Sequence, residues 1–217
     1  MDLKMPRAVF WDWDGTLADS YGFLNDAHNF TLEALGFAPF KEGEYRNYFG
    51  KPRETLYPAI YKDKCDEAMV VFQGYVLENS HKIQVLPDSR AVLELLHQKN
   101  IPMGIVSNKK ANLIEKELKY LGWDKYFKVV IGSGDARADK PSGAPLLLAL
   151  ENSGITDGFD DVWYVGDTEN DLACAKEVGC HAIFLNTLEN SQDLVKKYSP
   201  LINFDSYIRL NSILVAI

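Results

Sequence analysis

The chain has 217 residues with an ordinary globular composition, 47% hydrophobic and 25% charged. Its formal net charge of −8 argues against nucleic acid or an anionic membrane as the main partner. Its three cysteines are widely spaced, and neither a signal peptide nor an apolar run of spanning length is found. These features predict a cytoplasmic protein with reduced thiols, and they leave room for a small anionic substrate bound by local cations.

The type of element predicted along the chain changes twice, from a strand to helices only and then to alternating helices and strands. The apolar run at residues 8–11 predicts a buried strand of a parallel sheet. Residues 20–36 and 65–80 then have helical periodicity, with short helical pieces broken by glycine and proline between them. From residue 87 onward helices and strands alternate. The predicted helices are 88–100, 110–122, 145–154 and 172–179, the predicted strands are 102–108, 128–134, 161–167 and 180–186, and the tail at 200–217 would add a strand and a helix.

This order predicts an α/β fold with a doubly wound parallel sheet, because strands that alternate with helices form right-handed parallel crossovers. Residues 1–18 and 85–217 would form this core. Residues 19–84 would form an all-helical domain inserted directly after the first strand. An insertion at that point would sit above the carboxyl end of the strand, where a lid belongs.

Two carboxylates, Asp12 and Asp14, directly follow the first predicted strand. Each carboxylate repels the other and resists burial, so a nearby cation would remove much of the cost of placing them there. An ordinary Asp-Gly turn explains the same residues equally well when this stretch is taken alone.

Three other predicted strands are followed by polar residues that would lie at the same edge of the sheet. Each has a local explanation: Ser107 and Asn108 as a helix cap, Lys140 as a solvated loop lysine, and residues 166–168 as a turn with an N-cap. Together they would gather acids, a hydroxyl and an ammonium at the edge where open α/β sheets bind ligands. The joint pattern therefore predicts a site.

The set resembles the haloacid dehalogenase-like (HAD) hydrolase superfamily. Asp-x-Asp-Gly-Thr at 12–16, Ser107, Lys140-Pro141 and Gly-Asp-x-x-x-Asp at 166–171 occur in that family's order, and the helical insertion stands where its cap domain stands. The resemblance implies a Rossmann-like core and a magnesium-dependent phosphatase of the phosphoglycolate phosphatase type. It also implies a small phosphorylated metabolite as substrate, with the protein a monomer or a homodimer.

The resemblance also implies roles for the two acids of the first motif. Asp12 would attack phosphorus and form an aspartyl phosphate, and Asp14 would protonate the leaving alkoxide and later deprotonate water. Mg²⁺ suits an all-oxygen site. Its ligands would be Asp12, the backbone carbonyl of Asp14, and Asp167, while Asp171 would hold a metal-bound water or orient Lys140.

Phosphate-binding roles are implied for further residues of the motifs. Ser107 and Lys140 would bind the phosphoryl oxygens, Thr16 would hold the loop by its hydroxyl, and Asn108 would offer its backbone N–H to phosphate. Ser142 and Gly143 follow Lys140-Pro141 where the family more often runs directly into a helix, which would shift the lysine or lengthen its loop.

Substrate recognition is predicted for the insertion. The stretch Gly50-Lys51-Pro52-Arg53 resembles a cap loop that reaches over the active site, so that Lys51 or Arg53 would meet a second anionic group of the substrate. Two surface cations beside a proline are the simpler interpretation of the same residues.

Several alternatives stay open at this stage. Asp14 favours phosphate chemistry over dehalogenation, because a halide leaves without a proton. A phosphoglucomutase-like phosphoryl transferase would keep the same acid, and a catalytically silent ligand-binding member would keep the same fold. Receiver-type signalling domains are disfavoured because they are shorter and have no helical insertion.

Overall fold

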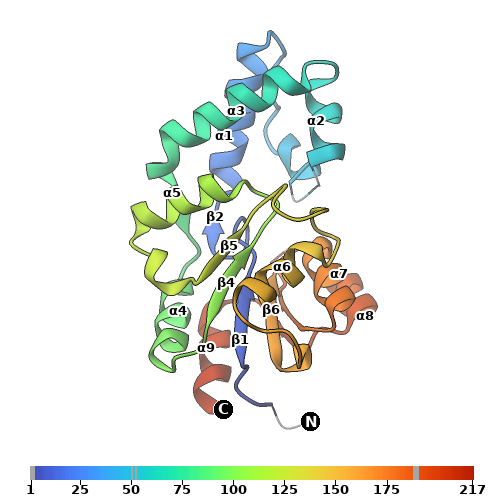
Figure 1. Ribbon diagram of the computed structural model, residues 1–217. Helices are drawn as coiled ribbons and strands as arrows, with labels where there is room; N and C mark the ends of the chain where they lie inside the picture. The colour runs from blue at the N-terminus through green and yellow to red at the C-terminus, as the bar shows by residue number, and fades with distance from the viewer. Residues whose placement is uncertain (1–2, 50, 52, 188–190) are drawn as a thin grey trace.

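The computed structural model describes residues 3–49, 51, 53–187 and 191–217 (Figure 1). Among them, the strands are β1 (Ala8–Trp11), β2 (Ala18–Asp19), β3 (Gln84–Val85), β4 (Met103–Val106), β5 (Val129–Ile131), β6 (Val162–Gly166), β7 (His181–Leu185) and β8 (Ile202–Phe204). The helices are α1 (Tyr21–Ala34), α2 (Arg53–Tyr61), α3 (Cys65–Asn79), α4 (Ser89–Gln98), α5 (Ala111–Leu121), α6 (Ala144–Asn152), α7 (Glu169–Val178), α8 (Ser191–Tyr198) and α9 (Tyr207–Ala216).

Within the described residues, six strands form one parallel sheet in the order β5-β4-β1-β6-β7-β8. The chain runs outward from β1 to β4 and β5, and then returns to the other side of β1 at β6. The loops on the two sides of β1 therefore run in opposite directions, which leaves a crevice at the carboxyl end of this strand. The predicted doubly wound parallel sheet is confirmed.

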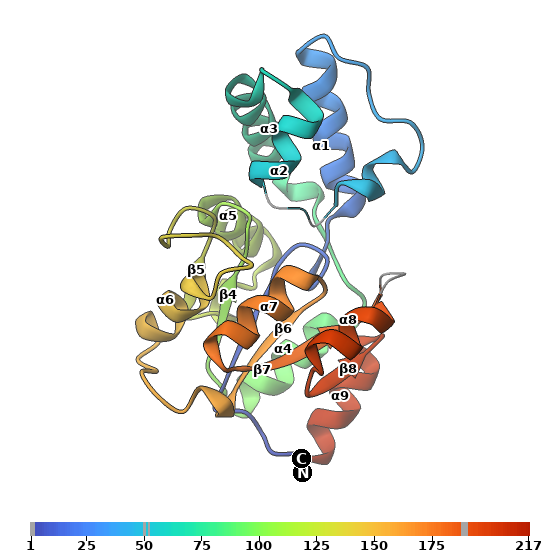
Figure 2. The same cartoon turned by 90° about the vertical axis from the view of Figure 1, so that its right-hand side faces the viewer.

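Strand β1 is buried on both faces, because alternate side chains of a strand point to opposite sides of the sheet. Val9 and Trp11 pack into an apolar cluster with residues of α4, α5 and α9. Ala8 and Phe10 pack into a second cluster with residues of α6 and α7. Helices thus cover both faces of the sheet (Figure 2), and β1 lies inside it, between β4 and β6.

The helices α1, α2 and α3 stand beyond the carboxyl ends of the sheet strands (Figures 1 and 2). They have apolar clusters largely of their own, in which Leu32 of α1 packs with Tyr57 and Tyr61 of α2. The two connections to the rest of the chain pair with each other as the antiparallel strands β2 and β3. The division into a core at 1–18 and 85–217 and a helical domain at 19–84 stays a prediction, and this two-stranded ribbon straddles both of its boundaries.

Several elements differ from the sequence-based expectation. Helix α2 runs through Pro58, where a break was expected, and the short strands β2 and β3 were not predicted. Helix α7 begins at Glu169 rather than at residue 172, because Thr168 caps it: Thr168 Oγ1 and Asp171 form a reciprocal capping box. Helix α8 was not predicted. In the tail, β8 and α9 form as expected. None of the helices in the described ranges is long and apolar enough to cross a membrane.

Candidate active site

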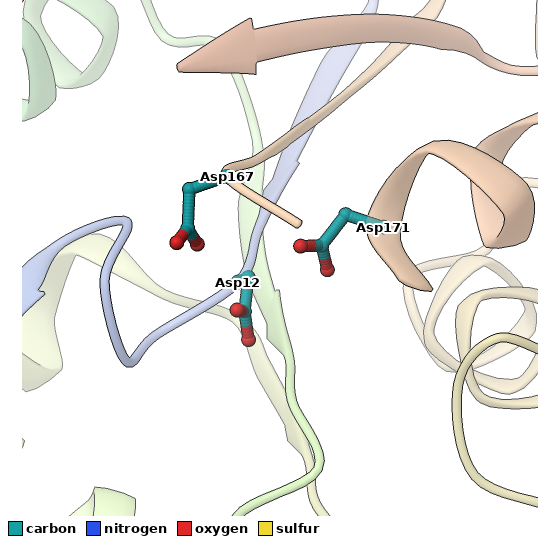
Figure 3. Close-up of side chains that lie close together, drawn as sticks. All are labelled: Asp12, Asp167 and Asp171. Carbon is teal, nitrogen blue, oxygen red and sulfur yellow. The ribbon is translucent and has the colours of Figure 1, made fainter. Parts of the chain in front are cut away.

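Three carboxylates meet at the carboxyl end of β1 (Figure 3). Asp12 directly follows β1, Asp167 directly follows β6, and Asp171 lies in the first turn of α7. One oxygen atom of each lies within 4.8 Å of the others, and all three residues are buried. The parallel pairing of β1 with β6 brings Asp12 and Asp167 together, as the motif order predicted.

Two glycines allow this close approach. Gly15 has φ +82°, which glycine adopts without strain, and a Cβ atom there would lie 2.5 Å from Asp167 Oδ2. A Cβ atom at Gly166 would collide with the side chain of Asp171. Larger residues at either position would push the carboxylates apart, so the glycines of the two motifs are needed for the geometry of the acid cluster.

Lys140 inserts its ammonium group between two of the acids. Its Nζ atom lies 2.8 Å from Asp12 Oδ1 and 2.6 Å from Asp171 Oδ1. Burial alone would lower the pKa of Lys140, but the two carboxylates outweigh burial and raise its pKa above the usual value. The lysine is therefore held in its charged form, and the Ser-Gly that follows in its loop does not displace it from the acids.

The side chain of Asn108 has a role that sequence reasoning missed. Its Nδ2 atom donates to the Lys140 carbonyl oxygen over 2.9 Å, and the Lys140 N–H donates to Asn108 Oδ1 over 3.0 Å. Asn108 thus fixes the backbone from which Lys140 projects. Neighbouring Ser107 is buried and lines the cavity described below, in keeping with the predicted contact to phosphate.

Both oxygens of Asp171 accept hydrogen bonds from the protein. Oδ1 accepts from Lys140 Nζ and lies 3.2 Å from Tyr164 Oη, whose shorter contact is with the Val106 carbonyl oxygen. Oδ2 accepts from the Thr168 N–H at 3.0 Å and from Thr168 Oγ1 at 2.7 Å. These contacts favour the predicted role of Asp171 in orienting Lys140, and its part in metal binding stays a prediction.

The donor set fits a divalent cation. Among the described residues of the cluster, three carboxylates and one ammonium group sum to −2 when all are ionised. Burial raises the pKa of Asp12 to about 6 against the opposing effect of Lys140, and burial with the neighbouring acids Asp171 and Asp12 raises the pKa of Asp167. Although Lys140 lies close, the buried Oδ1 atom of Asp12 accepts no well-directed hydrogen bond. A cation with oxygen ligands would supply the missing charge and the missing contact.

Thr16 and Tyr207 hold the first motif in place. Thr16 Oγ1 donates to Asp167 Oδ1 over 2.7 Å, and Tyr207 Oη in α9 donates to the Thr16 carbonyl oxygen over 2.5 Å. Thr16 is fully buried and is not among the residues that line the cavity, which favours the loop-holding role. Tyr207 gives the C-terminal tail a contact with the active-site loop.

Asp14 does not belong to the three-carboxylate cluster, and it lines a cavity. Its Oδ1 atom is 3.2 Å from Lys109 Nζ, and Lys109 also contacts both carboxylate oxygens of Glu117 in α5. Burial would lower the pKa of Lys109, but Asp14 and Glu117 outweigh it and raise that pKa. Sequence reasoning missed both Lys109 and Glu117. The signal available in the sequence was that Lys109 is the third polar residue in a row after the predicted strand, directly following Ser107 and Asn108.

The cavity has a volume of about 140 Å³ and lies between the acid cluster and the helices α1–α3. Its floor includes Asp12, Asp14 and Ser107. Its opposite wall is mainly aromatic and apolar, and includes Leu24, His28, Tyr45, Phe49, Leu56, Tyr57 and Phe72. The helical insertion therefore does face the predicted catalytic residues.

Lys51 and Arg53 also line this cavity. The Arg53 guanidinium carbon lies 5.6 Å from the centre of the Tyr57 ring, and Lys51 Nζ lies 5.4 Å from the centre of the Tyr48 ring. Their partners in the predicted recognition stretch, Gly50 and Pro52, lie outside the described residues. The two cations are in reach of a ligand, and their contact with substrate stays a prediction.

Comparison with known proteins agrees with this geometry. The sequence profile of the family described as "Haloacid dehalogenase-like hydrolase" matches residues 9–185. A phosphoglycolate phosphatase of Photorhabdus laumondii is 28% identical over 221 residues, which cover 95% of this chain and 92% of that protein. A phosphoglycolate phosphatase of Neisseria meningitidis is 32% identical over 187 residues, which cover 82% of this chain and 79% of that protein.

Solved structures share the fold over almost the whole chain. A haloacid dehalogenase-like hydrolase of Streptococcus pneumoniae has a TM-score of 0.83 at 23% identity, covering 95% of this chain and 97% of that one. CbbY of Rhodobacter sphaeroides, in complex with phosphate, has a TM-score of 0.79 at 19% identity, covering 94% and 95%. The match of the family profile to most of the chain decides the assignment: this protein belongs to the haloacid dehalogenase-like hydrolase family, and it is an enzyme similar to phosphoglycolate phosphatases.

Proposed function

We propose that this protein is a Mg²⁺-dependent phosphatase that hydrolyses a small phosphate monoester through an aspartyl-phosphate intermediate. One observation carries the proposal: Asp12 and Asp14 line the same cavity, with an ammonium group 2.8 Å from Asp12 Oδ1. A nucleophile, an acid and a phosphate-binding cation are the groups that phosphoryl transfer by this route needs.

In the first step, a carboxylate oxygen of Asp12 attacks phosphorus, and the bond from phosphorus to the leaving oxygen breaks. Asp14 gives its proton to that oxygen, so the product leaves as a neutral alcohol. Ser107 and Lys140 bind the phosphoryl oxygens as the charge on them shifts. Asn108 and Asp171 keep Lys140 in place during this step, through the hydrogen bonds described above.

In the second step, water attacks the phosphorus of the aspartyl phosphate. Asp14, now ionised, takes a proton from that water, and the bond from phosphorus to the Asp12 oxygen breaks. Inorganic phosphate leaves, the Asp12 carboxylate is restored, and Asp14 again holds its proton. The aromatic wall of the cavity would limit the entry of other water during the reaction.

Asp12, Asp167 and the backbone carbonyl of Asp14 would hold Mg²⁺, with Asp171 in the surrounding shell. When bound, Mg²⁺ neutralises charge on the phosphoryl oxygens and on the buried acids. The −2 charge of the described cluster and the unsatisfied Asp12 oxygen support this assignment.

Phosphoglycolate is the first substrate to test, because several curated relatives are named phosphoglycolate phosphatases. The cavity is small, and Lys51 and Arg53 line it, which supports a small substrate with a second anionic group. We further propose that the protein acts in the cytoplasm.

The test is phosphate release from a panel of small phosphate monoesters, with Mg²⁺ and with EDTA, by wild type and Asp12→Asn. We expect Mg²⁺-dependent release that the variant loses while its melting temperature stays within a few degrees of wild type. No release by folded wild-type protein would overturn the proposal and favour a phosphoglucomutase-like transferase or a silent binding protein.

A further inference from the structure

Glu117 is a fully buried acid that the proposed mechanism does not use. It lies on the buried face of α5, beside Ile114 and Leu118, which pack in the apolar cluster that includes residues of the sheet. Burying a carboxylate is costly, and a buried ion pair rarely stabilises a fold more than apolar side chains of the same size would. An apolar residue here would satisfy the packing of α5, so the glutamate calls for another explanation.

The contacts of Glu117 lead to the acid of the proposed mechanism. Its Oε1 and Oε2 atoms lie 2.7 and 2.8 Å from Lys109 Nζ. The same ammonium group lies 3.2 Å from Asp14 Oδ1. The contacts with Glu117 are the shorter ones and engage both of its oxygens, so Glu117 fixes the position of the ammonium group. The ammonium group in turn fixes the Asp14 carboxylate through its contact with Oδ1.

A second contact ties Glu117 to the backbone of the first motif. Trp13, which stands between Asp12 and Asp14, donates from Nε1 to Glu117 Oε2 over 2.6 Å. The Trp13 ring is fully buried and packs edge-on against Trp123, with 6.3 Å between ring centroids. Glu117 therefore holds the motif from two sides, through an indole in the loop and through an ammonium group at the Asp14 carboxylate.

These contacts leave one face of Asp14 directed at the cavity. Its side chain is 18% exposed, and Lys109 occupies Oδ1. Because the ammonium group contacts Oδ1, Oδ2 is the oxygen that stays available to the leaving group. Fixing the carboxylate in this way matters, because a misplacement of about 1 Å costs on the order of 100-fold in rate.

We propose that Glu117 is a positioning residue for the acid–base step, acting through Lys109 to hold the Asp14 carboxylate toward the leaving group. The inference rests on the proposed phosphatase function. It predicts that Glu117 affects substrates according to how much their leaving group needs a proton. A purely structural ion pair would affect all substrates alike.

The experiment compares kcat/KM for an alkyl phosphate and for p-nitrophenyl phosphate, with Mg²⁺ present. This ratio reports the steps up to release of the first product, where a poor leaving group needs the proton and p-nitrophenolate does not. The variants are Glu117→Gln, Lys109→Met and the double variant. Leu118→Ala is the control, because Leu118 is a buried neighbour on α5 that packs in the apolar core.

For Glu117→Gln we expect a loss of roughly 10- to 100-fold on the alkyl phosphate and a much smaller loss on p-nitrophenyl phosphate. In the Lys109→Met background, Glu117→Gln should cause no further leaving-group-dependent loss, because it acts through that lysine. Leu118→Ala should lower the melting temperature without changing the ratio between the two substrates.

Two outcomes would overturn the inference: equal losses on both esters in Glu117→Gln, or a leaving-group effect of Glu117→Gln that persists in full without Lys109. Failure of the phosphatase proposal itself looks different. In that case wild type releases no phosphate from either ester, whatever the variants do.

Discussion

The Lys140 ammonium group lies 2.8 Å from Asp12 Oδ1, in a site where both residues are almost fully buried. The proposed nucleophile therefore carries its own counter-charge before any ligand binds. Lys140 reduces the electrostatic repulsion between Asp12 and an incoming phosphate dianion, which would otherwise oppose the attack. Phosphoryl transfer depends mainly on positioning and charge neutralisation, and this pair provides part of both.

Asp14→Asn should separate substrates by their leaving groups. The variant keeps the shape of the side chain but has no proton to give, so kcat/KM for an alkyl phosphate should fall roughly 100-fold or more. The loss on p-nitrophenyl phosphate should be clearly smaller. Asp19→Asn, which alters an exposed carboxylate nearby in the chain, is the matched control and should match wild type. Equal losses on both esters would count against Asp14 as the acid.

Arg53→Ala should raise KM for substrates with a second anionic group. A lost charge-assisted contact of about 1.5–3 kcal/mol corresponds to a rise of roughly 10- to 100-fold. For p-nitrophenyl phosphate, which has no second anion, KM should change little. Arg46→Ala removes an exposed arginine of the same helical insertion that does not line the cavity, and it should affect neither substrate. If Arg53→Ala raises KM equally for both substrates, the arginine does not bind the second anionic group.

Magnesium should stabilise the wild-type protein and do so through Asp167. At a magnesium concentration near 100 times Kd, binding contributes about 2.7 kcal/mol, which raises the melting temperature by roughly 5 °C or more. Asp167→Asn removes one of the buried charges that the cation offsets, so this rise should be largely lost. Thermal unfolding with Mg²⁺ and with EDTA measures both effects. Asp157→Asn, at an exposed carboxylate, should keep the full rise, and retention of the rise in Asp167→Asn would exclude that residue as a ligand.

Acid should destabilise the protein through His28. Burial lowers the pKa of His28 to about 3, from an ordinary value near 6.5. As the pH falls below about 6.5, His28 binds a proton in the unfolded chain but not in the folded protein. The free energy of unfolding therefore decreases as the pH falls from 6.5 to about 3. At pH 5 this loss is about 2 kcal/mol.

The measurement is the melting temperature at pH 7 and pH 5 for wild type and His28→Leu. The variant lacks the titrating group, so its decrease between the two values should be smaller than that of wild type by roughly 5 °C. His97→Gln, which changes an exposed histidine, should behave as wild type does. The same decrease in all three proteins would show that His28 does not contribute.

The sequence was sufficient to predict the parallel α/β sheet and the cluster of Asp12, Asp167 and Asp171. The reason is physical: buried strands are apolar runs of recognisable length, and parallel strands end at a common edge. Polar residues that follow such runs can therefore meet at that edge, as Asp12 and Asp167 do, whereas the place of Asp171 was implied by the resemblance to the family. The start of α7 was missed by three residues, because the first turn is polar and the capping box that defines it leaves no apolar period.

The partners of these residues were decided by the tertiary structure. Glu117 lies within an ordinary amphipathic helix pattern, and its contact with Lys109 and Trp13 follows from how α5 packs on the sheet. The bond from Tyr207 to the Thr16 carbonyl joins the two ends of the chain. Local sequence specifies which face of an element is apolar, whereas the direction in which one buried polar side chain reaches depends on the neighbours that packing brings to it. For that reason the chemistry-bearing motifs were visible in the sequence, and the residues that position them became visible only in the folded chain.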